Sequence, residues 1–364
     1  MDLGKIFSKL ENNWLSHRQD RKTRILSIDG GGTNCIVAGA ALVYLEDQIQ
    51  AKTGDSNFRI SDFFDLIAGT GIGAIFASMI TADGGDGRPM FTARDAFRFL
   101  EDRRVEIFKP RRSGLLRRRR GFSGKAMEKA LKKALRRDGG GALTLKDTCK
   151  PLIVPCFDLN TSAPFVFSRA GASESPSFDF ELWKVCRASS ANPSVFDPFP
   201  LTSVNGKTSC VSIDGGLVMN NPSAAAVTHV LYNKRDFPAV NGVGDLAVLS
   251  LGNGVVNSHL PCHGNGGKVS TASVVDIVLD GVSETVDQML ATAFHWNPAY
   301  YVRIQGNGFR PETAEQVVAE RGLEWLPPLG GKRMATETNG ERIQKFVGLL
   351  VASTKKTNPV TEVR

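Results

Sequence analysis

Short apolar runs alternate along this chain with longer segments in which apolar residues recur every three or four positions. The short runs predict buried strands at 24–28, 63–68, 152–157, 165–167, 211–213, 246–251 and 301–304. The longer segments predict helices at 35–50, 74–80, 92–108, 124–137, 180–191, 271–293 and 336–353, with another after Pro222. Strands that alternate with helices favour a mostly parallel sheet covered on both faces. We therefore expect an α/β fold with three layers, α/β/α.

Three glycine-rich turns directly follow predicted strands. They are Asp29-Gly-Gly-Gly-Thr-Asn34, Gly69-Thr-Gly-Ile-Gly73 and Asp214-Gly-Gly216. Open α/β sheets bind their ligands at the carboxyl ends of their strands, where these turns are expected to lie. The three turns are therefore the candidate functional site.

The turn at 69–73 has the sequence context of a nucleophile elbow. An apolar run precedes it and a helix-like run follows it, which is where serine hydrolases place G-x-S-x-G with the serine on a strained turn. The central position is Gly71 in this chain. The sequence therefore predicts that the elbow geometry is kept while the usual nucleophile is missing.

The other two turns offer groups that acyl-transfer chemistry needs. Successive backbone N–H groups at Gly30, Gly31 and Gly32, at the start of a helix, attract negative charge and can form an oxyanion hole. Such a turn also cradles phosphates, so a phosphotransferase-like nucleotide-binding protein is an alternative, although we find no second phosphate motif. Asp214 can serve as a general base, or it can simply cap its turn.

In this order and context the motifs resemble those of the patatin-like phospholipase family, over roughly residues 23–255. Asp29–Gly32 resembles the family's oxyanion motif, Gly69–Gly73 its elbow and Asp214–Gly216 its D-G-G base motif. The stretch Ala188-Ser-Ser-Ala-Asn-Pro193 resembles the turn before its last catalytic strand. The resemblance implies a patatin-like α/β/α fold and the family's chemistry, in which a Ser–Asp dyad cleaves acyl esters of membrane lipids without histidine.

The sequence departs from the family at two places. Gly71 replaces the serine, and Gly32 is followed by Thr33-Asn34-Cys35 where the family usually has x-R-G. Both departures resemble the plant patatin-related subgroup with G-x-G-x-G, also called group III, whose members are described as acting on phospholipids and galactolipids. The resemblance implies a lipid acyl hydrolase that is weak without its serine. A catalytically inactive, lipid-binding scaffold or sensor is the alternative.

The resemblance also implies a role for each residue of the site. The assigned residues are the catalytic Asp214 with Gly71 at the missing nucleophile, the oxyanion-hole residues Gly30, Gly31, Gly32 and Ile72, the elbow residues Gly69 and Gly73, and Gly215 and Gly216 of the base motif. Loss of a nucleophile costs many powers of ten in rate, but oxyanion stabilisation leaves residual catalysis. Our preferred mechanism has Asp214 activating a water in the space of the absent side chain. Thr70 and Ser78 are less favoured as substitute nucleophiles.

One segment gives the chain its net charge of +8. Residues 98–137 hold 16 Lys and Arg against four Asp and Glu. The candidate lipid-surface residues in it are Arg111, Arg112, Arg117, Arg118, Arg119 and Arg120. An anionic membrane surface is the partner we expect, because basic residues bind such surfaces and Leu115, Leu116 and Phe122 can insert. A merely solvated loop is the alternative. No nucleic-acid partner is expected, since few aromatic residues accompany the charges.

Composition and segment boundaries complete the expectations. We predict an amphipathic helical segment at 1–22, a patatin-like domain at 23–255 with a basic insertion at about 109–137, and a mostly helical extension at 256–364 packed on that domain. We see no secretory signal, spanning segment or lipidation motif, and the six cysteines form no C-x-x-C pair. We expect a cytoplasmic protein with peripheral association to the plasma membrane or other intracellular membranes, and no metal or cofactor.

Overall fold

The computed structural model describes residues 22–31, 35–107, 124–137, 139–254, 271–306, 313–325 and 331–355. The predicted helix at 1–22 lies outside these residues except for Lys22, and Gly32 lies outside them as well. The same holds for the arginine-rich loop with its six candidate residues, Arg111, Arg112, Arg117, Arg118, Arg119 and Arg120. The expectations for these segments therefore stay predictions.

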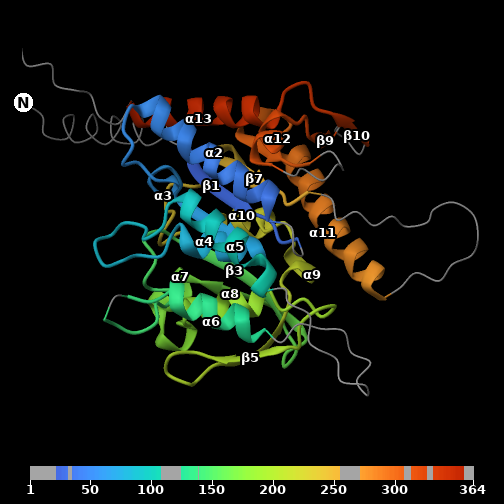
Figure 1. Cartoon of the computed structure of the whole chain (residues 1–364). Coiled ribbons are helices and arrows are strands. Elements are labelled where there is room, and N and C mark those ends of the chain that lie inside the picture. The colour runs from blue at the N-terminus through green and yellow to red at the C-terminus, as the bar shows by residue number, and fades with distance from the viewer. Residues whose placement is uncertain are drawn as a thin grey trace, which may run out of the picture.

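An eight-stranded sheet forms the centre of the molecule (Figure 1). Its strands are β1 (Thr23–Ile28), β2 (Leu66–Gly69), β3 (Leu152–Asp158), β4 (Ala163–Ser168), β5 (Phe199–Thr202), β6 (Ser209–Ile213), β7 (Leu246–Leu251) and β8 (Tyr301–Ile304). Their order is β5-β6-β3-β2-β1-β7-β8, and β4 also pairs with β3. The five strands β3, β2, β1, β7 and β8 run parallel, whereas β4, β5 and β6 pair antiparallel. The predicted mostly parallel sheet is confirmed.

Helices cover both faces of this sheet, because successive residues of a buried strand point to opposite sides. Leu26 and Ile28 of β1 face one apolar cluster, and Ile25 faces another. The first cluster contains residues of α2 (Ile36–Thr53), α4 (Ile72–Met79), α5 (Ala93–Ile107), α6 (Lys125–Ala134), α8 (Leu182–Ser189) and α13 (Asn339–Lys355). The second contains residues of α10 (Ser223–Tyr232) and α11 (Thr271–Ala293). The three-layer α/β/α architecture is confirmed.

The C-terminal part of the chain joins the same sheet. Its strand β8 pairs in parallel with β7, and α13 packs against α2 (Figure 1). The rings of Phe346 on α13 and Phe64 stack with centroids 6.4 Å apart. This part also contains α12 (Ala314–Ala319) and a two-stranded hairpin of β9 (Leu323–Trp325) and β10 (Lys332–Met334). The described residues of this part thus combine helices with an edge strand of the central sheet, and the predicted boundaries of the extension stay a prediction.

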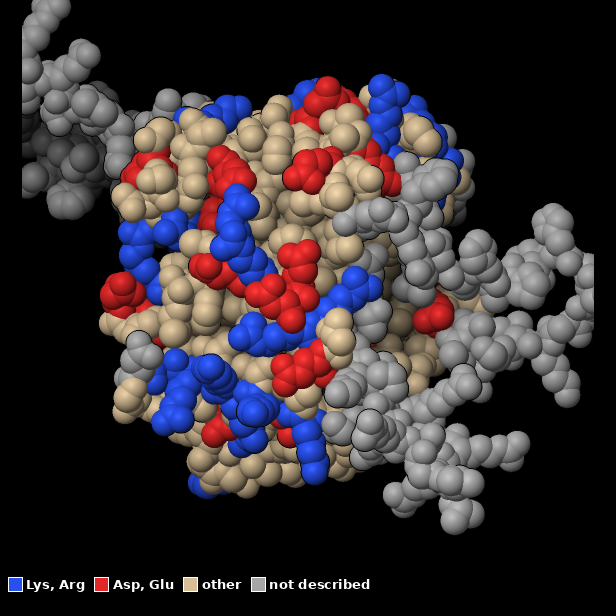
Figure 2. Space-filling view, in the orientation of Figure 1, with Lys and Arg blue, Asp and Glu red and all other residues tan. Residues whose placement is uncertain are grey.

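The helix α6 continues the basic segment and presents its charge outward. Met127 and Leu131 are buried against the core, so the helix has a fixed apolar face. Figure 2 shows Lys and Arg gathered on the surface over α6. The exposed cations of this basic face are Lys125, Lys129, Lys132, Lys133 and Arg136. No helix in the described part of the chain is long and apolar enough to cross a membrane.

Candidate active site

The turn after β2 has the geometry of an elbow. Gly71 stands between β2 and α4 with φ 55° and ψ −121°, a backbone conformation that residues with a side chain rarely adopt. A Cβ on Gly73 would clash with the carbonyl of Ile28, and one on Gly69 would clash with the carbonyl of Gly73. The two flanking glycines therefore let α4 start directly against β1 and β2. This close packing holds position 71 at the carboxyl edge of the sheet.

Position 71 has room for a side chain. A Cβ built on Gly71 would lie 3.5 Å from the Cα of Gly30, 3.8 Å from Oδ1 of Asp214 and 3.9 Å from the carbonyl oxygen of Ser189. These are ordinary van der Waals distances, so the surroundings would not need to move. A hydroxyl one bond beyond that Cβ comes within hydrogen-bond reach of the carboxylate. The structure thus brings together the two positions of the predicted dyad, with glycine at one of them.

Asp214 directly follows β6 and precedes the short helix α9 (Gly216–Met219). Its Oδ1 accepts a hydrogen bond from the Gly216 N–H at 2.8 Å, and the Asn192 side chain also hydrogen-bonds to the carboxylate. Burial raises the pKa of Asp214 to about 6, against the lowering effect of these two hydrogen bonds. A carboxylate with this pKa is ionised at neutral pH and still basic enough to accept a proton. Gly215 packs so closely on β3 that its Cβ would clash with the carbonyl of Pro155.

The nearest hydroxyl groups have structural roles. Ser189 accepts the Gly71 N–H at 2.9 Å and donates to the carbonyl of Pro155 at 2.7 Å, and its side chain is fully buried. Thr70 donates to the carbonyl of Met219 at 2.7 Å, and Ser78 lies 3.2 Å from the thiol of Cys186 inside the core. These contacts engage all three hydroxyl groups. Ser189 had no assigned role in the sequence, although its stretch resembles a family turn.

The loop after β1 brings further backbone groups to the elbow. The N–H of Gly30 donates to the carbonyl of Asn220 at 2.9 Å, so this predicted donor is not available to an oxyanion. The amide of Asn253 donates to the carbonyls of Asp29 and Gly30 at 2.6 and 3.1 Å and fixes the loop from the other side. Gly31 has φ 144°, and its Cβ would crowd Asn253.

The backbone N–H groups that stay available lie at Gly31 and Ile72. In the described part of the chain, no acceptor is found for either group. The N–H of Ile72 begins α4 and has no intrahelical partner, as is usual for the first turn of a helix. Within the described residues, no group of three or more His, Cys, Asp or Glu could hold a metal ion.

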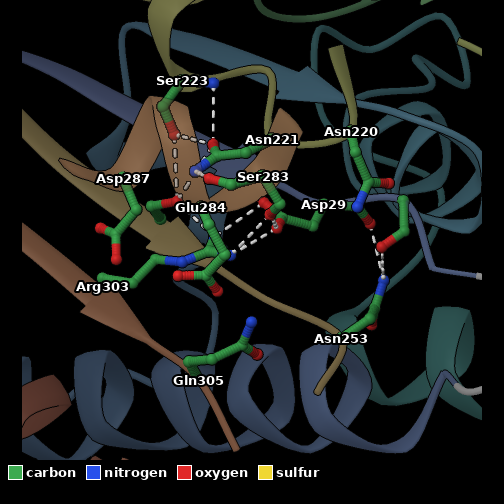
Figure 3. A network of polar contacts seen from close by, with 12 residues as sticks. Asp29, Asn220, Asn221, Ser223, Asn253, Ser283, Glu284, Asp287, Arg303 and Gln305 are labelled. Atoms are coloured by element: carbon green, nitrogen blue, oxygen red, sulfur yellow. Dashed lines mark hydrogen bonds and ion pairs between the residues drawn. The ribbon is translucent and has the colours of Figure 1, made fainter. Parts of the chain in front are cut away.

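A buried ion pair supports the loop from beneath (Figure 3). Arg303 of β8 donates from Nη1 to Oδ1 of Asp29 at 2.8 Å and from Nη2 to Oδ2 at 2.5 Å, and both side chains are at least 95% buried. Ser283 donates to the same carboxylate at 2.7 Å, and Arg303 also donates to Ser250 at 2.8 Å. Asn221 and Ser223 extend this network of polar contacts. No sequence pattern indicated this network, since Arg303 lies 274 residues beyond Asp29.

Burial and pairing act on this ion pair in opposite directions. Burial raises the pKa of Asp29, which disfavours its charge, whereas the neighbouring guanidinium lowers it. Burial disfavours the charge of Arg303, but the carboxylate raises its pKa. We take the charged pair as the native state, because a neutral Asp29 would give up two charge-assisted hydrogen bonds.

An α/β fold with an elbow, a loop of glycine amides and a buried aspartate defines a class of acyl-transfer proteins. The chain matches the patatin-like phospholipase family over residues 26–227. It is 63% identical over 367 residues to "Probable inactive patatin-like protein 9" of Arabidopsis thaliana, covering 99% of this chain and 95% of that protein. It is 42% identical over 369 residues to "Patatin-like protein 6" of the same plant, covering 92% and 72%. The chain therefore belongs to the patatin-like phospholipase family, among the plant patatin-like proteins.

Proposed function

We propose that this protein is a lipid acyl hydrolase that cleaves acyl esters slowly, with water as the nucleophile. The observation that carries the proposal is the 3.8 Å distance between Oδ1 of Asp214 and the Cβ position at Gly71. A water molecule in that space lies within hydrogen-bond reach of a base whose pKa is about 6. Membrane phospholipids and galactolipids are the proposed substrates, because hydrolysis of lipid acyl esters is the chemistry of the family.

The proposed reaction is a direct hydrolysis. Asp214 accepts a proton from water while the water oxygen attacks the acyl carbon, and the N–H groups of Gly31 and Ile72 stabilise the oxygen that becomes charged. The carbon–oxygen bond to the alcohol then breaks, and the alcohol takes the proton back from Asp214. The products are a fatty acid and an alcohol. The rate is expected to be low because no side chain at residue 71 forms an acyl-enzyme intermediate.

A catalytically silent lipid-binding protein is the second candidate. It is favoured by the absence of a hydroxyl at Gly71 and by the commitment of the neighbouring hydroxyl groups to structural contacts. The relative at 63% identity is itself named "Probable inactive patatin-like protein 9". In this candidate the site holds acyl lipid without turnover, and the protein acts as a scaffold or sensor.

Peripheral membrane association from the cytoplasmic side is part of the proposal. The basic face of α6, defined above, provides exposed cations on a helix whose apolar side is fixed to the core. Cations near an anionic leaflet each contribute on the order of 1 kcal/mol. This face supports the proposed attraction to anionic phospholipid, and the six arginines of the preceding loop would add to it.

Fatty-acid release from mixed phospholipid and galactolipid vesicles tests the proposal. Wild type, Asp214→Ala and Gly71→Ser are compared at equal concentration. We expect slow release by wild type, none by Asp214→Ala and a large gain in Gly71→Ser. Silence of wild type together with activity of Gly71→Ser would overturn hydrolysis by water and leave the lipid-binding candidate.

A further inference from the structure

A cavity lies at the β8 edge of the sheet, away from the elbow. It has a volume of about 460 Å³ and is lined by residues of α11, β8, the β9–β10 hairpin and α13. Small-molecule sites usually measure about 300–1,000 Å³, so this cavity has the size of a ligand site. Arg303 belongs both to its wall and to the polar network around Asp29, and Asp287 of the wall is drawn with that network in Figure 3.

One part of the wall is apolar and aromatic. The rings of Phe294 and Tyr301 stack with centroids 5.8 Å apart, and Trp325 lines the cavity from β9. From α13, Phe346 and Leu349 line it as well. A surface of this kind offers extended apolar contact, which favours binding of a hydrocarbon group.

Two pairs of opposite charge lie in the wall of the cavity. Arg333 donates to Glu324 at 2.8 Å, and Lys345 forms an ion pair with Glu337. Arg342 also lines the cavity, and its buried Nη1 has no hydrogen-bond partner among the described residues. Burial lowers the pKa of Arg342, which the nearby acidic groups oppose. An unsatisfied buried guanidinium nitrogen is costly, and an anion would satisfy it.

Arg342 and the apolar lining residues of α13 lie on the same face of that helix. Arg342, Lys345, Phe346 and Leu349 all line the cavity, and their spacing places them on one face of the helix. Asp287 on the opposite wall is engaged by the Tyr301 hydroxyl at 2.8 Å. Arg342 therefore places a cation at one end of a mostly apolar cavity.

We propose that this cavity binds a single-chain amphiphile with an anionic head group, such as a fatty acid or a lysophospholipid with a terminal phosphate. Arg342 binds the head group, and the wall of Phe294, Trp325, Phe346 and Leu349 takes the hydrocarbon chain. The volume suits one chain of moderate length rather than a two-chain lipid. The proposal does not require turnover at the elbow, so it stands or falls separately from the proposed hydrolysis.

Isothermal titration calorimetry of the full chain tests the proposal with three probes of known chemistry. Dodecanoate carries both chain and carboxylate, dodecan-1-ol carries the chain alone, and acetate carries the carboxylate alone. We expect dodecanoate to bind at least tenfold more tightly than dodecan-1-ol, and acetate to show no binding. A lysophosphatidic acid with the same chain distinguishes the two head groups, and tighter binding than dodecanoate would identify phosphate as the preferred anion.

Two variants and a control locate the site. Arg342→Gln is expected to weaken dodecanoate at least tenfold and to leave dodecan-1-ol unchanged. Ala299→Trp, at an exposed lining position, fills the cavity and is expected to weaken both ligands without touching an ion pair. Arg94→Gln removes an exposed arginine from α5 and should bind like wild type. No binding by wild type, or unchanged binding by both cavity variants with wild-type melting temperatures, would overturn the proposal.

Discussion

Gly71 has a backbone conformation that residues with a side chain rarely adopt, and they do so mainly at functional sites. Its φ of 55° and ψ of −121° lie outside the regions that L-residues occupy comfortably, so glycine is the residue that fits there with least strain. Around it, the carboxylate of Asp214 and the two close-packed glycines of the elbow stay in place. The site therefore keeps the geometry for a nucleophile while the strain that a nucleophile would impose is absent.

Substitution of Gly71 should therefore lower stability. We expect Gly71→Ser and Gly71→Ala each to reduce the free energy of unfolding by about 1–3 kcal/mol, the usual cost of a strained backbone conformation. Urea denaturation followed by circular dichroism measures it. The alanine variant has the strain but no hydroxyl, so it is the control for activity. Equal stability of wild type and Gly71→Ala would show that position 71 is not strained.

The carboxyl group of Asp214 should make stability depend on pH. Because its pKa is raised to about 6, the folded protein binds this proton more tightly than the unfolded chain, where the pKa is about 3.9. The stabilisation from the proton is fully present below about pH 4 and is lost as pH rises through about 6. The shift of about two units corresponds to about 3 kcal/mol, which sets the upper limit of the effect.

Asp214→Asn should remove this dependence. Asparagine keeps an acceptor for the Gly216 N–H but cannot ionise, so we expect the variant to be more stable than wild type at pH 8 by up to about 3 kcal/mol. The difference should shrink to near zero below pH 4. Urea denaturation at four pH values measures it. A difference that does not vary with pH would contradict a raised pKa at Asp214.

At the scale of elements, β8 ties the C-terminal part of the chain to the loop after β1. Register places Ser27, Ser250 and Arg303 side by side across β1, β7 and β8, so Arg303 reaches Asp29 from two strands away. Both charges are buried, and a buried charge that loses its partner is strongly destabilising. The packing of β8, which comes late in the sequence, thus fixes the position of the glycine turn that begins at Asp29.

Removal of the guanidinium should test this link. We expect Arg303→Met to lower the free energy of unfolding by about 3–5 kcal/mol, because Asp29 is left as an uncompensated buried charge. The double variant Asp29→Asn with Arg303→Met should recover part of this loss. Denaturant unfolding of the three variants provides the measurement. A loss below about 1 kcal/mol for Arg303→Met would show that the pair does not hold the loop.

The sequence pattern predicted the elements that are long or that are buried on both faces of the sheet. It missed elements that are short or exposed. Strands β3 and β7 are nearly continuous apolar runs and β1 contains an apolar core of Ile25, Leu26 and Ile28, which is why the pattern found them. The hairpin strands β9 and β10 have three residues each and no fully buried position, so no apolar run marks them.

The sequence also predicted one part of the candidate site and missed another. Its glycine turns and Asp214 stand directly after apolar strands, and the structure brings them together at Gly71. The Gly30 N–H was assigned to an oxyanion, but its partner is the carbonyl of Asn220, a contact made through the fold alone. Arg303 and Ser189 were missed for the same reason, since a lone arginine or serine in a strand or helix has no local signature.

At the scale of the whole molecule, the excess positive charge is concentrated in one segment of the chain, residues 98–137. The basic face of α6 follows directly on the arginine-rich loop in the sequence, and the rest of the chain carries more acidic than basic residues. Attraction of this kind is screened by salt over about 8 Å at physiological ionic strength. The surface would therefore orient the protein on an anionic membrane without inserting a helix.

Charge reversal on α6 should weaken membrane binding. We expect the double variant Lys129→Glu with Lys133→Glu to bind vesicles containing 30 mol% phosphatidylserine at least tenfold more weakly, at about 1 kcal/mol or more for each reversed charge. Co-sedimentation at low and high salt measures it. The control with the same net charge is Lys207→Glu with Arg235→Glu, exposed positions outside the basic face. Equal binding by the two double variants would show that net charge, and not this surface, governs the attraction.

The central claim is that the patatin site is intact except for its nucleophile, and acylation of Gly71→Ser tests it most directly. The variant is incubated with p-nitrophenyl dodecanoate, quenched in acid and analysed by intact-mass and peptide mass spectrometry, beside wild type and Gly71→Ser with Asp214→Asn. The predicted result is a dodecanoyl adduct on residue 71 that forms at least a hundredfold more slowly in the double variant and does not form in wild type. A folded Gly71→Ser protein that stays unmodified at residue 71, or that acylates equally well without Asp214, would contradict the claim.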